Sequence, residues 1–272
     1  MREVLTEKQM YELCNTVKPC SRVIETRFNG KYNYNYSNQR HVNSTLDYLI
    51  NEGLALPRPA SHLIPGIRKY KTDNDGVLEI LEFPVLFPSE KYKDISDVSL
   101  FGPMTGVLTH CYDPKNQTYA FQVRGRKIQG ERLISASKIQ IGAAAFGWYG
   151  EDLGDSAIRE LKEELGKDGK LVMPKDTFLD VSPFVFKNET GSYPQPLFSF
   201  VAQANLSGIE EVENIKQIKE MIEDLKEIEV SDRFVVPLDN LEKISKEIDN
   251  SIGFYGPMYE TIKSFLKWLY HN

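Results

Sequence analysis

Residues 143–167 read AAAFGWYGEDLGDSAIRELKEELGK, and their pattern is the most informative in the chain. Ala157, Leu161 and Leu165 recur every four residues, which is the spacing of the buried stripe on an α-helix. Asp152 stands where a side chain can cap the first backbone N–H groups of such a helix. The pattern therefore predicts a helix that begins after Asp152 and ends near Leu165.

Three carboxylates share the other face of this predicted helix. Glu160, Glu163 and Glu164 are three and four residues apart, so they repel one another unless a positive group lies against them. Arg159 is adjacent, and Glu151 in the preceding loop could hold that arginine. A hard divalent cation would neutralise the rest, because Mg²⁺ prefers carboxylate oxygens and shares its sites with substrate phosphates. The alternative is a solvated acidic face, which is common on glutamate-rich helices.

The spacing of the stretch resembles the Nudix box, GX5EX7REUXEEXGU, in which U is a bulky aliphatic residue. The specified positions that agree number seven: Glu151, Arg159, Glu160, Leu161, Glu163, Glu164 and Gly166. Two positions depart from the pattern, since Ala145 stands for the first glycine and Lys167 for the closing aliphatic residue. Alanine keeps the backbone carbonyl of that position but restricts its dihedral angles, whereas Lys167 would affect packing more than catalysis.

The resemblance implies a hydrolase that uses Mg²⁺ or Mn²⁺ and cleaves a pyrophosphate bond by attack of water on phosphorus. The implied metal ligands are three carboxylates and one backbone carbonyl: Glu160, Glu163, Glu164 and Ala145. The implied catalytic group is Glu160, which would orient or deprotonate the water, with Arg159 holding Glu160 and pairing with Glu151. Relatives carry a further glutamate well past the box, for which the chain offers Glu210, Glu211, Glu213, Glu227 and Glu229.

The expected substrate is a small molecule, a nucleoside diphosphate linked to another group. Pro183, sixteen residues beyond Lys167, resembles a proline of the ADP-ribose and nucleotide-sugar subgroup and slightly favours those substrates, although prolines also start strands and turns. Arg124 and Arg126 precede the box and are candidates to hold phosphate oxygens. The alternating tyrosines of residues 31–36 either stack on a base or pack an edge strand.

The rest of the chain mixes helical and strand patterns, which favours an α/β or α+β core. Apolar residues make up 41% of the chain, enough to bury such a core. Helices are predicted at residues 6–17, 43–52, 209–228 and 259–270, and strands at 76–87 (broken by Pro84), 106–111, 118–124, 197–206 and 234–238. The resemblance implies a Nudix-type α/β/α sandwich with a mixed β-sheet at residues 96–272, closed by a C-terminal helix, and an N-terminal α+β extension of unknown role at residues 1–95.

The net charge of −6 gives the chain no general attraction to nucleic acid or anionic lipid. Three cysteines without a CxxC pair, no apolar signal segment and no apolar run of membrane length favour a cytoplasmic protein that does not bind membranes. The resemblance is compatible with a homodimer, because many relatives dimerise. Two alternatives stay open: a pyrophosphohydrolase of RNA 5′ ends, which the acidic charge disfavours, and a nucleotide sensor that kept the fold with weak catalysis.

Overall fold

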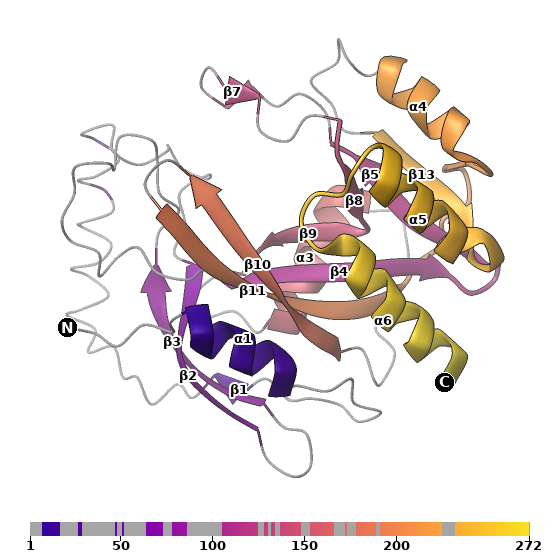
Figure 1. Ribbon diagram of the computed structural model, residues 1–272. Coiled ribbons are helices and arrows are strands. Elements are labelled where there is room, and N and C mark those ends of the chain that lie inside the picture. Colours follow the sequence, from indigo (N-terminus) through magenta and orange to yellow (C-terminus); the bar gives the residue numbers. More distant parts are fainter. Residues whose placement is uncertain are drawn as a thin grey trace.

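The computed structural model describes residues 7–16, 27–28, 47, 51, 64–72, 78–85, 105–124, 128–129, 132–133, 137–147, 153–165, 172, 178–188, 191–224 and 232–271. Its centre is one mixed β-sheet with helices on both faces (Figure 1). This is an α/β sandwich, the fold class that the sequence predicts. Within the described ranges, no helix combines the length and the apolarity that crossing a membrane requires.

Eight strands form the central sheet: β4 (Gly106–Asp113), β5 (Thr118–Val123), β8 (Ile139–Ile141), β9 (Ala143–Phe146), β10 (Phe178–Asn188), β11 (Gly191–Gln203), β12 (Glu210–Glu211) and β13 (Asp232–Pro237). Six of them follow the order β10-β11-β4-β5-β13-β12, while β8 pairs with β5 and β9 pairs with β4. The β11–β4 and β12–β13 pairs are parallel, and the other pairs are antiparallel. The sheet is therefore mixed, with β4 and β5 at its centre.

Helices cover this sheet from two sides. The described ones are α1 (Glu7–Thr16), α3 (Leu153–Leu165), α4 (Ile215–Asp224), α5 (Leu241–Ser251) and α6 (Met258–His271), with a 3-10 turn, η4 (Leu238–Asn240), before α5. In the view of Figure 1, α3 lies behind the sheet and α5 and α6 lie in front of it. α1 packs on β10 and β11, with Met10 and Leu13 fully buried.

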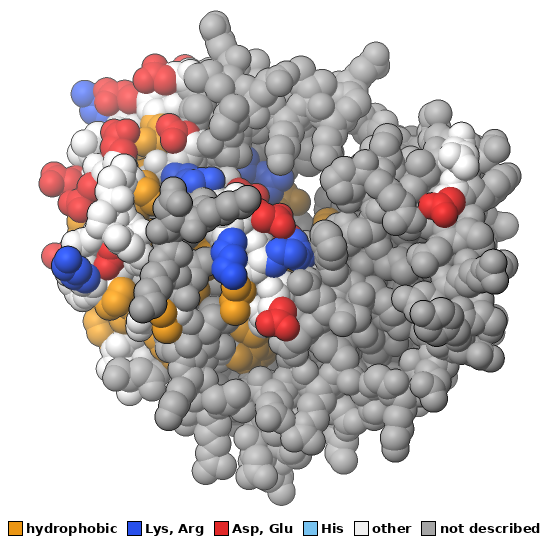
Figure 2. All heavy atoms as spheres, turned by 180° about the vertical axis from the view of Figure 1, so that it is seen from behind, with side chains coloured by type: hydrophobic (Ala, Val, Ile, Leu, Met, Phe, Trp, Pro, Cys, Tyr) orange, Lys and Arg blue, Asp and Glu red, His pale blue; other side chains and the backbone are white. Residues whose placement is uncertain are grey.

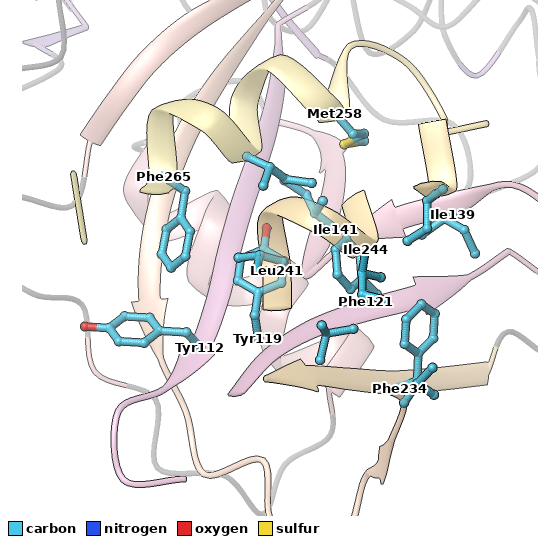
Figure 3. Packing of buried hydrophobic residues seen from close by; sticks show 14 of the residues in the cluster. Tyr112, Tyr119, Phe121, Ile139, Ile141, Phe234, Leu241, Ile244, Met258 and Phe265 are labelled. Atoms are coloured by element: carbon cyan, nitrogen blue, oxygen red, sulfur yellow. The ribbon is translucent and has the colours of Figure 1, made fainter. Parts of the chain in front are cut away.

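An aromatic core lies between the sheet and the helices α5 and α6 (Figure 3). Tyr119, Phe121 and Val123 alternate along β5, so all three side chains point to this face. The ring centroid of Phe121 lies 5.0 Å from that of Tyr119 and 5.3 Å from that of Phe234. Phe265 of α6 completes the cluster, 5.0 Å from Tyr119. Burial of these rings stabilises the fold from this face.

A glycine lets one segment change partners in the middle of the sheet. β4 and β5 pair directly only next to their turn, and beyond it residues 139–146 fill the gap between them. β8 pairs with β5, β9 pairs with β4, and the change falls at Gly142, whose φ is +27°. A Cβ at Gly142 would lie 2.0 Å from the carbonyl oxygen of Thr109, so only glycine fits. This step places β9, in which the box begins at Ala145, beside β4 at the centre of the sheet.

Most predicted elements of residues 96–272 are confirmed. The hairpin at 106–124, the helix ending at Leu165, the strands at 197–206 and 234–238 and the final helix are observed as β4–β5, α3, β11, β13 and α6. The elements that the sequence analysis does not predict include β8, β9, β10 and α5.

The prediction of one helix over residues 209–228 is wrong at its start. Glu210 and Glu211 form β12 beside β13, and α4 begins only at Ile215. Asn214 explains the boundary, because its side-chain oxygen accepts hydrogen bonds of 3.1 and 3.2 Å from the first backbone N–H groups of the helix. Val212 N also donates to a carbonyl of β13, which holds this segment on the sheet. An amphipathic spacing of apolar residues therefore spans a strand and a helix here.

The N-terminal region contains a separate sheet with the order β1-β3-β2, built from β1 (Arg27–Phe28), β2 (Ile64–Thr72) and β3 (Leu78–Val85). β3 continues through Pro84, which pairs with Pro65, although the sequence predicts a break there. A small pair joins β6 (Ile128–Gln129) to β7 (Arg132–Leu133). The predicted helix 43–52 is described only at residues 47 and 51, which are helical, while residues 31–36 and the boundary near 95 lie outside the described residues. The division into 1–95 and 96–272 stays a prediction.

Candidate functional site

Helix α3 is anchored on the sheet by its apolar side. Leu153, Ala157 and Leu161 are fully buried. Leu161 packs in a cluster made mostly of small side chains: Cys111, Ala120, Ala143, Ala202, Ala204, Leu206 and Val235. Because alanine takes little space, the helix lies close to the strands, and polar side chains on its flank come within reach of the sheet.

The three glutamates of α3 differ in exposure. The Glu160 side chain is 13% exposed, and its carboxylate accepts a hydrogen bond from the guanidinium of Arg159. The Glu163 side chain is 60% exposed, with Oε1 3.6 Å from Nη1 of Arg159. Figure 2 views the side of the molecule on which α3 lies, and basic and acidic side chains adjoin on the described part of that face. Arg159 therefore neutralises Glu160 directly and Glu163 partly.

The environment of Glu160 raises its carboxyl pKa above the ordinary value. Burial is the largest cause, the hydrogen bond and charge of Arg159 oppose it, and the negative charges of Glu163 and Glu164 add to it. This is the result expected where carboxylates are crowded and one arginine does not fully compensate them.

Glu164 is tied to the sheet rather than to Arg159. Gln122 of β5 donates a hydrogen bond of 2.7 Å from Nε2 to Oε2 of Glu164. Gln140 of β8, directly across from Gln122 in the sheet, donates from Nε2 to Oε1 of Gln122 at 3.4 Å. Arg124 in turn donates from Nη1 to Oε1 of Gln140 at 2.7 Å. A continuous polar row thus runs from an arginine on the sheet to a carboxylate on the helix.

Arg124 has a second support besides Gln140. Its guanidinium carbon lies 4.2 Å from the centre of the Tyr255 ring, a cation–π geometry. The segment that carries Tyr255 is bonded to β8, because Tyr255 N donates to the carbonyl of Ile139 at 2.9 Å. Arg124 N also donates to the carbonyl of Lys138 at 2.9 Å. The position of this cation is therefore fixed by backbone and side-chain contacts together.

Two further predicted site residues, Ala145 and Pro183, lie on different strands. Ala145 lies in β9, half-buried, opposite Val107 of β4. Pro183 lies in β10, paired with Pro196 of β11, and β10 is separated from β5 by β11 and β4 in the strand order. The structure therefore does not bring Pro183 beside Arg124.

Several predicted residues cannot be placed, and the later glutamates that can be placed are exposed. Glu151, Arg126, Lys167, Glu227 and Glu229 lie outside the described residues. Glu210 and Glu211 of β12 and the following Glu213 are exposed to solvent. Their roles, like those of the other site residues, stay predictions.

The donor chemistry on α3 fits a hard divalent cation, since Glu160, Glu163 and Glu164 offer carboxylate oxygens from one helix. The side chains are not gathered into a ready site: among the residues that the structure describes, no three His, Cys, Asp or Glu side chains form a metal-binding group. Arg159 and Gln122 hold the carboxylates instead. A cation would have to draw these oxygens together.

Gln122, Gln140 and Tyr255 are site residues that the sequence analysis does not identify. The sequence does mark the two glutamines, because each interrupts an apolar strand: Gln122 in TYAFQV and Gln140 in IQI. Both side chains are buried, with 5% and 2% exposed, and a buried amide requires partners. Tyr255 has no comparable signal, because it reaches Arg124 only through the tertiary fold.

Comparison with known proteins gives little beyond this geometry. No protein-family model and no curated protein matches the chain. Among solved structures, the chain is similar to a mutT/nudix family protein from Listeria innocua, with 13% sequence identity and a TM-score of 0.30. That match covers 61% of this chain and 94% of the other. A likeness at this TM-score establishes neither the family nor an activity of this chain.

Proposed function

We propose that this chain is a hydrolase dependent on Mg²⁺ or Mn²⁺ that cleaves the pyrophosphate bond of a nucleoside diphosphate linked to another group. ADP-ribose or a sugar nucleotide is the substrate class we favour, on the resemblance of Pro183 to a subgroup proline. The support comes from the box residues and from where their side chains lie.

One observation carries the proposal: Glu160, Glu163 and Glu164 lie on a helix that packs against the sheet, not on a free surface helix. Glu160 is 13% exposed, and Glu164 is bonded to a buried side chain of β5. Acidic side chains on an ordinary solvated face have no reason to be half-buried beside each other, because burial without compensation disfavours their charged forms. A site that receives a cation gives such a reason.

The residues would divide the reaction as follows. Glu160, Glu163 and Glu164 would hold the cation, which when bound supplies the positive charge that the diphosphate and the attacking water both need. Glu160 would also orient the water and accept its proton, and Arg159 would hold Glu160 in place. Arg124 would bind phosphate oxygens, since an arginine presents several N–H donors and only one of its nitrogens is engaged by Gln140 here.

The test is hydrolysis of a panel of nucleoside diphosphate derivatives by the purified full chain with Mg²⁺ or Mn²⁺. Glu164→Gln keeps the size of the side chain and removes its charge. We expect the rate to fall by about a hundredfold or more, because a cation held at such a site stabilises the transition-state charge by several kcal/mol. Circular dichroism and the midpoint of thermal unfolding should stay close to those of the unchanged protein.

A matched control is Glu242→Gln, which removes the same charge from the exposed first turn of α5. This variant should hydrolyse at the unchanged rate. A Glu164→Gln protein that turns over as fast as Glu242→Gln would contradict the assignment of the site.

A second function has one observation in its favour. The Glu163 side chain is 60% exposed, unlike that of Glu160. A nucleotide sensor must bind the nucleotide but does not need every carboxylate. Calorimetry with the same nucleotide panel separates the two functions, because tight binding without turnover in Mg²⁺ or Mn²⁺ would favour the sensor.

A further inference from the structure

We propose that Gln122 and Gln140 are positioning residues: they form an amide relay from Arg124 to Glu164 that fixes one oxygen of Glu164 and leaves the other for the cation. The inference rests on the proposed function, since it concerns the same carboxylate. It adds two residues outside the box and joins the phosphate-binding arginine to a metal ligand.

The strands place the relay on the face that carries α3. Gln122 and Gln140 are directly opposite in the antiparallel pair β5–β8, so their side chains emerge on the same side of the sheet. Arg124 follows Gln122 by two residues and shares that side. Ala120, two residues earlier, packs with Leu161 of α3, which identifies the side as the one facing the helix. The polar row therefore starts where the apolar contact of α3 ends.

The hydrogen bonds of the relay all run in one direction. Arg124 donates to Gln140, Gln140 donates to Gln122, and Gln122 donates to Glu164, at 2.7, 3.4 and 2.7 Å. The two ends fix this direction, because an arginine can only donate and an ionised carboxylate can only accept. Each amide must then present its oxygen toward Arg124 and its nitrogen toward Glu164. The orientation of both glutamines is set by charge rather than by packing.

The direction assigns different tasks to the two oxygens of Glu164. Oε2 accepts the hydrogen bond from Gln122, so Oε1 is the oxygen that we assign to the cation. A hydrogen bond on one oxygen restricts rotation of the carboxylate and lowers the entropy cost of binding a cation with the other. Partners of metal ligands commonly act in this way, and their loss weakens metal binding by about tenfold to a hundredfold.

Packing alone does not explain two adjacent buried amides. The same sheet face is filled elsewhere by Ala120, Ala143 and Ala202. Burying an amide costs free energy unless its donor and acceptor are both bonded. Among the residues that the structure describes, the amide partners of Gln122 are Glu164 and Gln140, and those of Gln140 are Gln122 and Arg124. The two glutamines are thus matched to the charged groups at the ends of the row.

The test measures Mn²⁺ affinity of the full chain without substrate, from the electron paramagnetic resonance signal of free Mn²⁺. Gln122→Met keeps the length of the side chain and removes its donor, and Gln140→Met does the same one step further along the relay. The matched control is Gln203→Met, because Gln203 of β11 is a half-buried strand glutamine that donates to the hydroxyl of Tyr112 at 2.8 Å. Glu164→Gln serves as the reference for loss of the ligand.

We expect Gln122→Met to bind Mn²⁺ about tenfold more weakly, Gln140→Met to lose less, and Gln203→Met to match the unchanged protein. A Gln122→Met protein with unchanged affinity, beside a clear loss in Glu164→Gln, would overturn the relay and leave the proposed function standing. If the unchanged protein and Glu164→Gln bind Mn²⁺ equally poorly, the proposed function fails and the relay fails with it.

A second measurement does not require a substituted glutamine to fold. In the metal-free protein, we expect Glu164→Gln to shift the side-chain amide NMR signals of both Gln122 and Gln140. The hydrogen bonds of the described residues join Gln140 to Gln122 and Arg124 and not to Glu164, so a shift of its signal reports transmission through the relay. A shift confined to Gln122, or absent from both, would overturn the proposal.

Discussion

The two faces of strand β5 are built for different tasks. One face carries Tyr119, Phe121 and Val123, which pack with the aromatic cluster under α5 and α6. The other face carries Ala120, Gln122 and then Arg124, beneath α3. Large apolar and small or polar residues therefore alternate along β5, because neighbouring side chains of a strand point to opposite sides of the sheet.

The difference separates stability from chemistry. Large rings on the first face remove much apolar surface from water, which is the main favourable term in folding. Small side chains on the second face bury less, but they let α3 come close enough for Glu164 to meet Gln122. Changes on the first face should therefore reduce the free energy of unfolding, and changes on the second face should mainly affect the cation and the substrate.

The largest effect is expected from Phe121→Ala. Phe121 is fully buried and its ring lies beside those of Tyr119, Phe234 and Phe254. Truncation leaves a cavity, and we expect the free energy of unfolding in urea to fall by about 3–5 kcal/mol. Gln122→Met, one residue away on the other face, should lose less stability than Phe121→Ala. Equal losses at the two positions would contradict the separation of the faces.

The same alternation explains how much of this structure is predictable from sequence. The pattern in TYAFQV and the spacing of Ala157 and Leu161 predict β5 and α3, because burial on one side leaves a periodic signal. The glutamates on α3 follow from the same spacing. Such local patterns say which residues share a face, but not what that face meets.

The parts that the sequence analysis does not predict depend on contacts far apart in the chain. Tyr255 is about 130 residues from Arg124, and only the fold places its ring against the guanidinium. The sequence analysis starts this helix too early because Ile209 and Val212 fit a helical stripe. Pairing with β13 and the capping side chain of Asn214 instead set the start of α4. Tertiary pairing overrides local periodicity at such positions.

The second prediction concerns Gly142, at which the alternation of side chains between the two faces of the sheet is shifted. Ile141 belongs to the aromatic cluster, yet Ala143, two residues later, belongs to the cluster under α3. An uninterrupted strand would place both on one side, so the irregularity at Gly142 accounts for the exchange. Gly142→Ala forces a Cβ to 2.0 Å from the carbonyl oxygen of Thr109. We expect the free energy of unfolding in urea to fall by roughly 3 kcal/mol.

The matched control for this change is Gly208→Ala. Gly208 also has a positive φ, +89°, but a Cβ there meets no atom within 4 Å. Its substitution tests backbone strain without the steric clash, and we expect a loss of about 1–2 kcal/mol. If Gly142→Ala costs no more than Gly208→Ala, the carbonyl of Thr109 does not restrict the step between β8 and β9.

The smallest of the three effects tests an exception on the aromatic face. His110 of β4 is fully buried, stacks on Phe265 at a centroid distance of 5.3 Å, and shares a hydrogen bond of 2.7 Å with the hydroxyl of Tyr119. Burial lowers the pKa of His110 from 6.5 to about 3. His110 therefore binds a proton below about pH 6.5 in the unfolded chain, but only below about pH 3 in the folded chain. The contribution of neutral His110 to the free energy of unfolding is therefore fully present above pH 6.5 and is lost progressively as the pH falls toward 3.

At pH 5 this loss amounts to about 2 kcal/mol, since each unit of pKa difference is worth about 1.4 kcal/mol. The double variant His110→Phe with Tyr119→Phe keeps the stacked rings and removes both polar partners, so neither is left unbonded. We expect its free energy of unfolding, measured in urea, to fall about 2 kcal/mol less between pH 7.5 and pH 5 than that of the unchanged protein. Tyr119→Phe alone keeps the buried imidazole and should retain the full acid sensitivity. If the double variant is as acid-sensitive as the single one, protonation of His110 does not limit the stability of the aromatic face.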